Sequence, residues 1–321
     1  MAFKLETVDQ GMGLARAIKP ALVAMDLHDL AVHRFKQGDP LLTPWLHSQD
    51  LAMVFAGRGI GKTHLAFAVS LAVATGGTFA KWSAPKPAKV LYLDGELPGS
   101  VCQARLGMHT TDVEPQPGLF RIFTPDLLPD GVALPDLSTA AGQDEVNKLI
   151  EPDTALVVID NLSAWCRTGR ENDAESWHPV ADWILELRRR GLAVLMIHHA
   201  GKGGEQRGTS KREDLLDVVI KLSRPSDYNP NRGAVFNLEF TKARNLTGDD
   251  AQSLELALTG DEKQAEWTCK TVDAGTFDRV VTLANEGLSQ AEIVVELGIN
   301  KSNVSRHYRR AKAEGRITEM S

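Results

Sequence analysis

Apolar and polar positions alternate in blocks along the middle of the chain, and these blocks predict a sheet covered by helices. From Leu51 to about Pro225, short aliphatic or β-branched runs are separated by stretches with apolar residues at helical spacing. Runs that are apolar throughout are typical of parallel strands buried on both faces. The predicted strands are Leu51–Ala56, Lys89–Leu93, Leu119–Phe123, Ala155–Ile159, Leu192–Ile197 and Leu216–Leu222.

The pattern changes on both sides of this block. After Pro225, polar turns join further strand-like runs, which favour an antiparallel extension of the sheet. Before the block, apolar positions at helical spacing from Gly11 to Phe35 predict a helical arm that ends at the turn signal Gly38-Asp39-Pro40. The extension comprises Ala234–Thr241, Ser253–Leu258 and Glu266–Val272.

Short helical segments replace the strands after Asp273 and continue to the end of the chain. We therefore predict an α/β protein with a mostly parallel sheet and helices on both of its faces. The predicted divisions are an N-terminal helical arm at 1–44, an α/β core at 45–272 and a small all-α domain at 273–321.

Composition narrows the class of protein. The 321 residues are 43% hydrophobic and 24% charged, enough for one sizeable core and a short second module. The net charge of −6 gives no general attraction to nucleic acid, so any DNA contact must come from local basic patches. Three cysteines (Cys102, Cys166 and Cys269) lack metal-ligand spacing, which favours a reducing compartment. No apolar run approaches the roughly 20 residues that span a bilayer, so we expect a cytoplasmic protein without a membrane partner.

A glycine-rich loop joins the strand Leu51–Ala56 to a helix predicted over His64–Ala74. The loop has the spacing of a P-loop, with Ala56 where the usual signature has its first glycine. Its glycines let backbone N–H groups turn toward phosphate oxygens, Lys62 reaches the β and γ phosphates, and Thr63 ligates Mg²⁺. The residues expected to hold ATP are Gly57, Arg58, Gly59, Ile60, Gly61, Lys62, Thr63 and His64.

Two acidic positions supply the chemistry that such a loop needs for hydrolysis. Asp160 closes the buried strand Ala155–Ile159, the Walker B arrangement that holds Mg²⁺ together with Thr63. Glu96 follows the strand Lys89–Leu93 and is expected to orient or deprotonate the attacking water. Asp94 is the alternative, because it lies closer to the end of the strand.

Two histidines end the predicted strand Leu192–Ile197, at the carboxyl edge where open α/β sheets bind ligands. Adjacent strand residues point to opposite faces and no third ligand is evident, so zinc binding is disfavoured. Two readings of His198 and His199 stay open: one of them senses the γ-phosphate by a hydrogen bond, or they are packed strand-end residues.

These motifs together resemble plasmid RepA-type hexameric helicases, which belong to the RecA/DnaB-like ATPases. The resemblance covers roughly residues 45 to 245. It implies a RecA-like fold and a homo-oligomeric, usually hexameric, ring that uses ATP and Mg²⁺ at subunit interfaces, with single-stranded DNA in a central channel. Glu96 then matches the catalytic glutamate, and His199 the residue that links the γ-phosphate to a DNA-contacting loop. The motifs in order are the P-loop, Val90–Glu96, the Asp160 strand, Ile197–Gly203 and Arg207–Ser210.

The resemblance also implies a cation supplied by the neighbouring subunit. Lys242-Ala243-Arg244-Asn245 resembles the Lys-x-Arg-Asn finger of DnaB-like helicases, so Arg244 and Lys242 are the predicted catalytic cations in trans, with Arg207 in reserve. The segment from Gly201 to Arg212 is basic and is either a DNA-contacting loop or a solvated run of charge. Its predicted DNA-binding residues are Lys202, Arg207, Lys211 and Arg212.

The end of the chain carries a second motif. Ser289–Gly298 has the cap and the glycine stop of one helix, and Asn300–Glu314 favours a second helix after a short turn, as in a helix-turn-helix. The second helix is basic and fits duplex DNA, although small basic helix pairs also dock proteins. The residues expected to contact DNA are Lys301, Ser302, Asn303, Arg306 and Arg310.

Two functions remain in view from the sequence. The first is an ATP-dependent, ring-forming DNA motor, a helicase or translocase, in plasmid or mobile-element DNA replication. The second is a nucleotide-switched DNA-binding regulator or initiation protein that does not unwind DNA. A metabolic P-loop enzyme is a third possibility if DNA has no effect on the ATPase.

Overall fold

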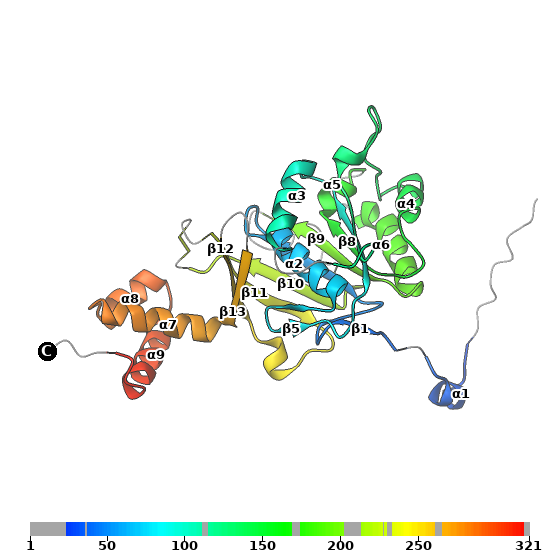
Figure 1. Ribbon diagram of the computed structural model, residues 1–321. Helices are drawn as coiled ribbons and strands as arrows, with labels where there is room; N and C mark the ends of the chain where they lie inside the picture. Colours follow the sequence, from blue (N-terminus) through cyan, green and yellow to red (C-terminus); the bar gives the residue numbers. More distant parts are fainter. Residues whose placement is uncertain are drawn as a thin grey trace, which may run out of the picture. The chain divides into compact units, whose positions relative to one another are not determined.

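The computed structural model describes residues 24–35, 37–110, 115–168, 174–201, 213–226, 228–229, 233–260 and 265–317 (Figure 1). The chain divides into two compact units, Met1–Gln37 and Gly38–Ser321. The first unit contains the helix α1 (Leu27–Val32), whose N-cap Asp26 accepts a hydrogen bond from the N–H of Asp29. The helix predicted over Gly11–Phe35 ends earlier, because the backbone at His33 is extended, and its part before residue 24 lies outside the described residues.

The second unit is built on a sheet that has nine strands among the described residues, in the order β13-β12-β11-β10-β3-β9-β8-β6-β7. The strands from β10 to β7 in this order pair in parallel, which confirms the predicted core sheet. Observed bounds lie within a residue or two of the predicted ones. They are β3 (Leu51–Ala56), β6 (Lys89–Asp94), β7 (Phe120–Phe123), β8 (Thr154–Asp160), β9 (Ala193–His199) and β10 (Val218–Ser223).

The other strands form the antiparallel extension that the sequence predicted. β11 (Ala234–Ala243) pairs with β10, and β12 (Leu254–Gly260) and β13 (Ala265–Thr271) follow it to the edge of the sheet. Shorter elements escaped prediction because two to four residues carry no periodicity. They are β1 (Pro40–Leu42), β2 (Leu46–His47), β4 (Thr78–Phe79), β5 (Trp82–Ser83), η1 (Pro125–Leu127) and η4 (Gly248–Ala251).

Helices cover both faces of the sheet, and the apolar side chains of β3 pack alternately against the two helical layers. Ala52 and Val54 belong to the core that packs against α2 (Lys62–Thr75), whereas Met53 and Phe55 belong to the core on the other face, which includes α6 (Ala174–Arg189). Successive strand residues point to opposite faces, so an uninterrupted apolar strand serves both cores. The remaining helices of this region are α3 (Gly99–Met108), α4 (Ala140–Asn147) and α5 (Leu162–Trp165).

Three helices follow the last strand: α7 (Val272–Asn285), α8 (Gln290–Leu297) and α9 (Lys301–Ala313). A capping box between Ser289 and Glu292 starts α8, and Gly298 ends it in the left-handed conformation. The three helices share a small apolar core of their own. The predicted helix pair is therefore present as α8 and α9, while its role and the domain boundary stay predictions. Among the described helices, none has the length and apolar character to cross a membrane.

Candidate nucleotide site

The predicted site residues meet at one edge of the sheet because β3, β9, β8 and β6 are parallel neighbours. Ala56 at the end of β3 is in register with His199 at the end of β9. Asp160 at the end of β8 is in register with Asp94 at the end of β6. Parallel strands bring their carboxyl ends to a common edge, which is where open α/β sheets bind ligands.

The glycines of the loop are required by the backbone and by packing. Gly59 and Gly61 have positive φ angles of 70° and 124°. A Cβ atom at Gly61 would lie 2.9 Å from the ring of Phe236 on β11, so this glycine also lets the loop approach the antiparallel part of the sheet. Ile60 packs against the core, so its backbone alone is available to a phosphate.

Lys62 begins α2 and is folded back onto the loop. Only 6% of the residue is exposed. Its Nζ atom donates to the carbonyls of Ala56 (3.2 Å) and Gly57 (2.9 Å) and lies 3.2 Å from Nδ1 of His199. Burial lowers the pKa of Lys62, while the nearby carboxylates of Asp160 and Glu96 raise it. A phosphate at the loop must draw this ammonium away from neutral carbonyls, which a charged acceptor can do.

Asp160 and Thr63 supply the oxygens expected at a magnesium site. Asp160 is buried, accepts a hydrogen bond from the hydroxyl of Tyr92 at 2.7 Å and is hydrogen bonded to Thr63. Burial raises the pKa of Asp160, and the hydrogen bonds from Tyr92 and Thr63 oppose that rise. The described residues contain no group of three His, Cys, Asp or Glu side chains that could hold a metal alone. The pair therefore fits Mg²⁺ that completes its shell with phosphate oxygens and water.

Glu96 and Asp94, the two candidates for the residue that activates water, differ in exposure and in hydrogen bonding. Asp94 is 1% exposed, and its carboxylate accepts hydrogen bonds from the backbone N–H groups of Glu96 (3.3 Å) and Leu97 (3.2 Å). Burial raises its pKa to about 6. The side chain of Glu96 is 50% exposed and lines the cavity, with Oε1 3.6 Å from Nε2 of His199. Asp94 therefore shapes the turn, and Glu96 is the carboxylate that a water can reach.

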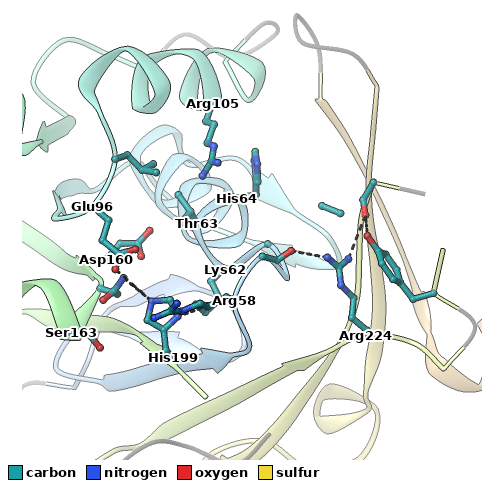
Figure 2. A pocket seen from close by; sticks show the side chains of 17 residues that line it. Arg58, Lys62, Thr63, His64, Glu96, Arg105, Asp160, Ser163, His199 and Arg224 are labelled. Atoms are coloured by element: carbon teal, nitrogen blue, oxygen red, sulfur yellow. Dashed lines mark hydrogen bonds and ion pairs between the residues drawn. The ribbon is translucent and has the colours of Figure 1, made fainter. Parts of the chain in front are cut away.

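His199 lies close both to Lys62 of the phosphate loop and to Glu96 after β6 (Figure 2). Burial, the largest cause, lowers its pKa, so the ring is neutral. The ring faces the donors Lys62 Nζ at Nδ1 and Asn161 Nδ2 at Nε2, both at 3.2 Å, but a neutral imidazole accepts at only one nitrogen. With Nδ1 accepting from Lys62, the proton lies on Nε2, which is 3.6 Å from Oε1 of Glu96 and then cannot accept from Asn161. His198 is buried and does not line the cavity, so His199 is the one of the two histidines that a γ-phosphate could contact.

A cavity of about 840 Å³ connects these groups, a size typical of ligand sites. Its walls include residues that the sequence did not single out: Arg105 from α3, Asn161 and Ser163 after β8, and Arg224, Tyr228, Gly233 and Ala234 around the turn between β10 and β11. Arg224 donates to the carbonyl of Gly59 at 2.7 Å and covers the ring of Tyr228 at 3.7 Å (Figure 2). The signal that could have found Arg224 is its place directly after a strand, but the sequence does not reveal that β10 lies beside β3.

His64 also lines the cavity but brings no charge to it. Its Nδ1 atom lies 3.1 Å from Nε2 of His109, and burial lowers the pKa of both histidines to about 4. The two rings are therefore neutral near pH 7. Positive charge in the described wall of the cavity comes from Arg58, Lys62, Arg105 and Arg224.

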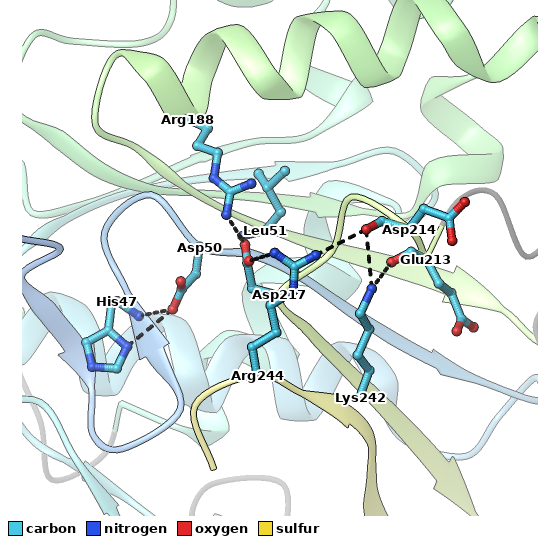
Figure 3. A network of polar contacts seen from close by, with 9 residues as sticks. All are labelled: His47, Asp50, Leu51, Arg188, Glu213, Asp214, Asp217, Lys242 and Arg244. Carbon is cyan, nitrogen blue, oxygen red and sulfur yellow. Dashed lines mark hydrogen bonds and ion pairs between the residues drawn. The ribbon is translucent and has the colours of Figure 1, made fainter. Parts of the chain in front are cut away.

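Lys242 and Arg244 lie at the opposite end of the strands from the cavity, near Leu51 where β3 begins (Figure 3). The residue between them, Ala243, is in register with Val218 at the start of β10, which pairs with the start of β3. Arg244 contacts Asp217 (3.2 Å) and donates to the carbonyl of Asp214 (3.3 Å). Lys242 donates to the carbonyls of Glu213 and Asp214. Neither cation lines the cavity of its own chain, and the catalytic role predicted for them in trans stays a prediction.

The predicted DNA-binding residues form two groups, of which the structure describes only the one in α9. Lys202, Arg207, Lys211 and Arg212 lie outside the described residues. In α9, Arg306 pairs with Asp273 at 2.6 Å and Arg310 with Glu314 at 2.8 Å, while both arginines remain more than half exposed. The other three lie in the first turn of α9, where the side chain of Asn300 accepts from the N–H of Asn303 and the hydroxyl of Ser302, and Lys301 is exposed.

The fold and the site together define a P-loop ATPase. Comparison with protein families matches residues 18–205 to the family described as AAA domain. The match covers more than half of the chain, and the chain belongs to this family. A solved structure described as the RadB recombinase is similar at 18% identity and a TM-score of 0.46, over 68% of this chain and 90% of that one. No curated protein matches the sequence.

Proposed function

We propose that the protein is an ATP-driven DNA motor, a helicase or translocase, that works as a ring in plasmid or mobile-element replication. One observation supports the proposal: the phosphate site and the two cations predicted to act in trans lie at opposite ends of the strands of one sheet. Lys62, Asp160 and Glu96 line the cavity, while Lys242 and Arg244 stand at the far end. A head-to-tail contact between copies would unite these two regions, and such contacts form a ring when the rotation between copies closes.

The residues of the chain then have separate tasks. The loop glycines and Lys62 bind the phosphates, and Thr63 with Asp160 holds Mg²⁺, which when bound neutralises charge on the β and γ phosphates. Glu96 accepts a proton from the attacking water, and His199 couples the state of Glu96 to that of Lys62 through its two ring nitrogens. Arg244 and Lys242 of a neighbouring copy stabilise the negative charge that develops in the transition state.

The test is ATP turnover with and without single-stranded DNA, combined with the mass of the assembly with and without nucleotide. We expect DNA to raise turnover, nucleotide to favour a closed oligomer, and a partial duplex to be separated only when ATP is present. Stimulation without strand separation would favour the nucleotide-switched regulator. If DNA does not change the rate of ATP turnover, both the motor and the regulator are contradicted, and a metabolic P-loop enzyme is favoured.

A further inference from the structure

In the described part of the chain, attachments of two different kinds join the three C-terminal helices to the ATPase sheet. The first attachment is ionic and buried: Glu255 on β12 is 3% exposed and meets Arg279 of α7 at 2.5 Å and Lys270 of β13 at 3.7 Å. α7 also continues directly from β13. A buried and doubly paired carboxylate is costly to separate from its partners, so this attachment fixes α7 to the sheet.

The second attachment lies at the end of α8 and includes a hydrogen bond. The hydroxyl of Ser226 donates to the carbonyl of Leu297 at 2.5 Å. Leu297 is the last residue of α8, where carbonyls lack partners within the helix. Gly298, which ends the helix, also lies against Ser226: a Cβ atom added to Gly298 would be 3.6 Å from the Cβ of Ser226. The segment after β10 thus supports the turn between α8 and α9.

The same segment touches the nucleotide cavity two residues earlier. Arg224 lines the cavity and donates to the carbonyl of Gly59 in the phosphate loop at 2.7 Å. Further bonds run to the carbonyls of Gly233 (3.5 Å) and Val235 (3.2 Å). All of these acceptors are neutral, whereas a phosphate offers the guanidinium an opposite charge and two oxygens for bidentate hydrogen bonds. A nucleotide phosphate in the cavity is therefore a better partner for this guanidinium than the carbonyl of Gly59.

We propose that Arg224 binds the nucleotide and that the segment Arg224–Ser226 transmits occupancy of the cavity to the turn between α8 and α9. Arg224 exchanges the carbonyl of Gly59 for the nucleotide, Ser226 moves with it, and the support of Leu297 changes while the Glu255 attachment holds. The two states differ in identifiable contacts, as coupling between sites requires. The inference rests on the ATP binding of the proposed function but not on a ring, a motor or DNA.

The experiment is hydrogen exchange of the natural protein, without DNA, in the absence and presence of Mg²⁺ with ADP or with the imido analogue of ATP. We expect nucleotide to change exchange at the amides of Gly298–Asn300. Ser226→Ala should remove this change while nucleotide affinity stays within about threefold of the natural protein, since Ser226 does not line the cavity. Arg224→Gln should weaken nucleotide binding by about tenfold or more and should abolish the change even at saturation.

Two matched controls separate transmission from general damage. Thr282→Ala removes a hydroxyl that donates only within α7, and Arg190→Gln removes an exposed guanidinium that contacts Asn147. Both should keep the nucleotide-dependent change. The inference is overturned if nucleotide binds but exchange at Gly298–Asn300 does not respond, or if Ser226→Ala still responds. A protein that binds no nucleotide would overturn it together with the proposed function, so the two failures can be distinguished.

Discussion

Replacing Glu96 by glutamine isolates the proton-accepting step from nucleotide binding. The substitution conserves the shape of a side chain that is 50% exposed and whose Oε1 atom lies 3.6 Å from Nε2 of His199. Asp94, which shapes the turn, is untouched. The folded structure should therefore be preserved, and any change in rate reports on chemistry.

The expected loss of turnover follows from the role of Glu96 as a general base. A positioned general base contributes about 10²- to 10⁴-fold, which corresponds to about 2.7–5.4 kcal/mol of transition-state stabilisation. Glu96 also raises the pKa of Lys62 by its charge, so its neutralisation leaves the phosphate loop more positive overall. Nucleotide affinity should thus be equal or higher, while turnover at saturating ATP falls by at least about 10²-fold.

The assay compares turnover with nucleotide affinity in Glu96→Gln and in Glu145→Gln. Glu145 is an exposed residue of α4 that pairs with Lys148, and its replacement should change neither quantity. Turnover by Glu96→Gln within about threefold of the natural protein, with a base expected to give 10²-fold, would refute the assignment. Asp94 would then be the next residue to test.

Three further predictions concern the loop and its surroundings. Lys62→Ala should weaken nucleotide binding roughly 10- to 150-fold, the cost of charged hydrogen bonds, in a calorimetric titration. Gly61→Ala should lower the free energy of unfolding by about 1–3 kcal/mol and prevent nucleotide binding, because φ is 124° and Phe236 is 2.9 Å from the new atom, whereas Gly107→Ala in α3, with open space, should not. Burial holds the pKa of His64 and His109 at about 4, below the ordinary 6.5, so the unfolded chain binds more protons between these values. The free energy of unfolding should therefore fall as pH is lowered from 6.5 toward 4, and replacing both by glutamine should flatten that dependence, as urea titrations would show.

The sequence predicted the elements well where burial leaves a continuous apolar run. β3 was placed to the residue, and the approach of Lys62, Asp160, Glu96 and His199 followed from motifs that each stand at the end of a parallel strand. Those positions are local properties of the chain, readable from strand, loop and helix order.

Features that depend on strand order could not be predicted. The sequence does not say that β10 lies beside β3, and this pairing is what brings Arg224 and Tyr228 to the phosphate loop. Likewise, a short Lys-x-Arg pattern does not show that Asp217 and the carbonyls of Glu213 and Asp214 hold both cations in place. Such contacts join residues distant in sequence, where local pattern carries no signal.

The most direct test of the central claim, that ATP is hydrolysed between subunits, is to mix two inactive variants. An Arg244→Ala subunit keeps Glu96, and a Glu96→Gln subunit keeps Arg244, so an interface between them in the right order holds a complete site. Random mixing in equal amounts should give about a quarter of the natural turnover, since each head-to-tail interface has one chance in four of being complete. Lys148→Ala, which removes an exposed cation that pairs with Glu145 of α4, should be active alone. Turnover that never exceeds that of the separate variants at any mixing ratio, or full activity of Arg244→Ala by itself, would contradict hydrolysis in trans.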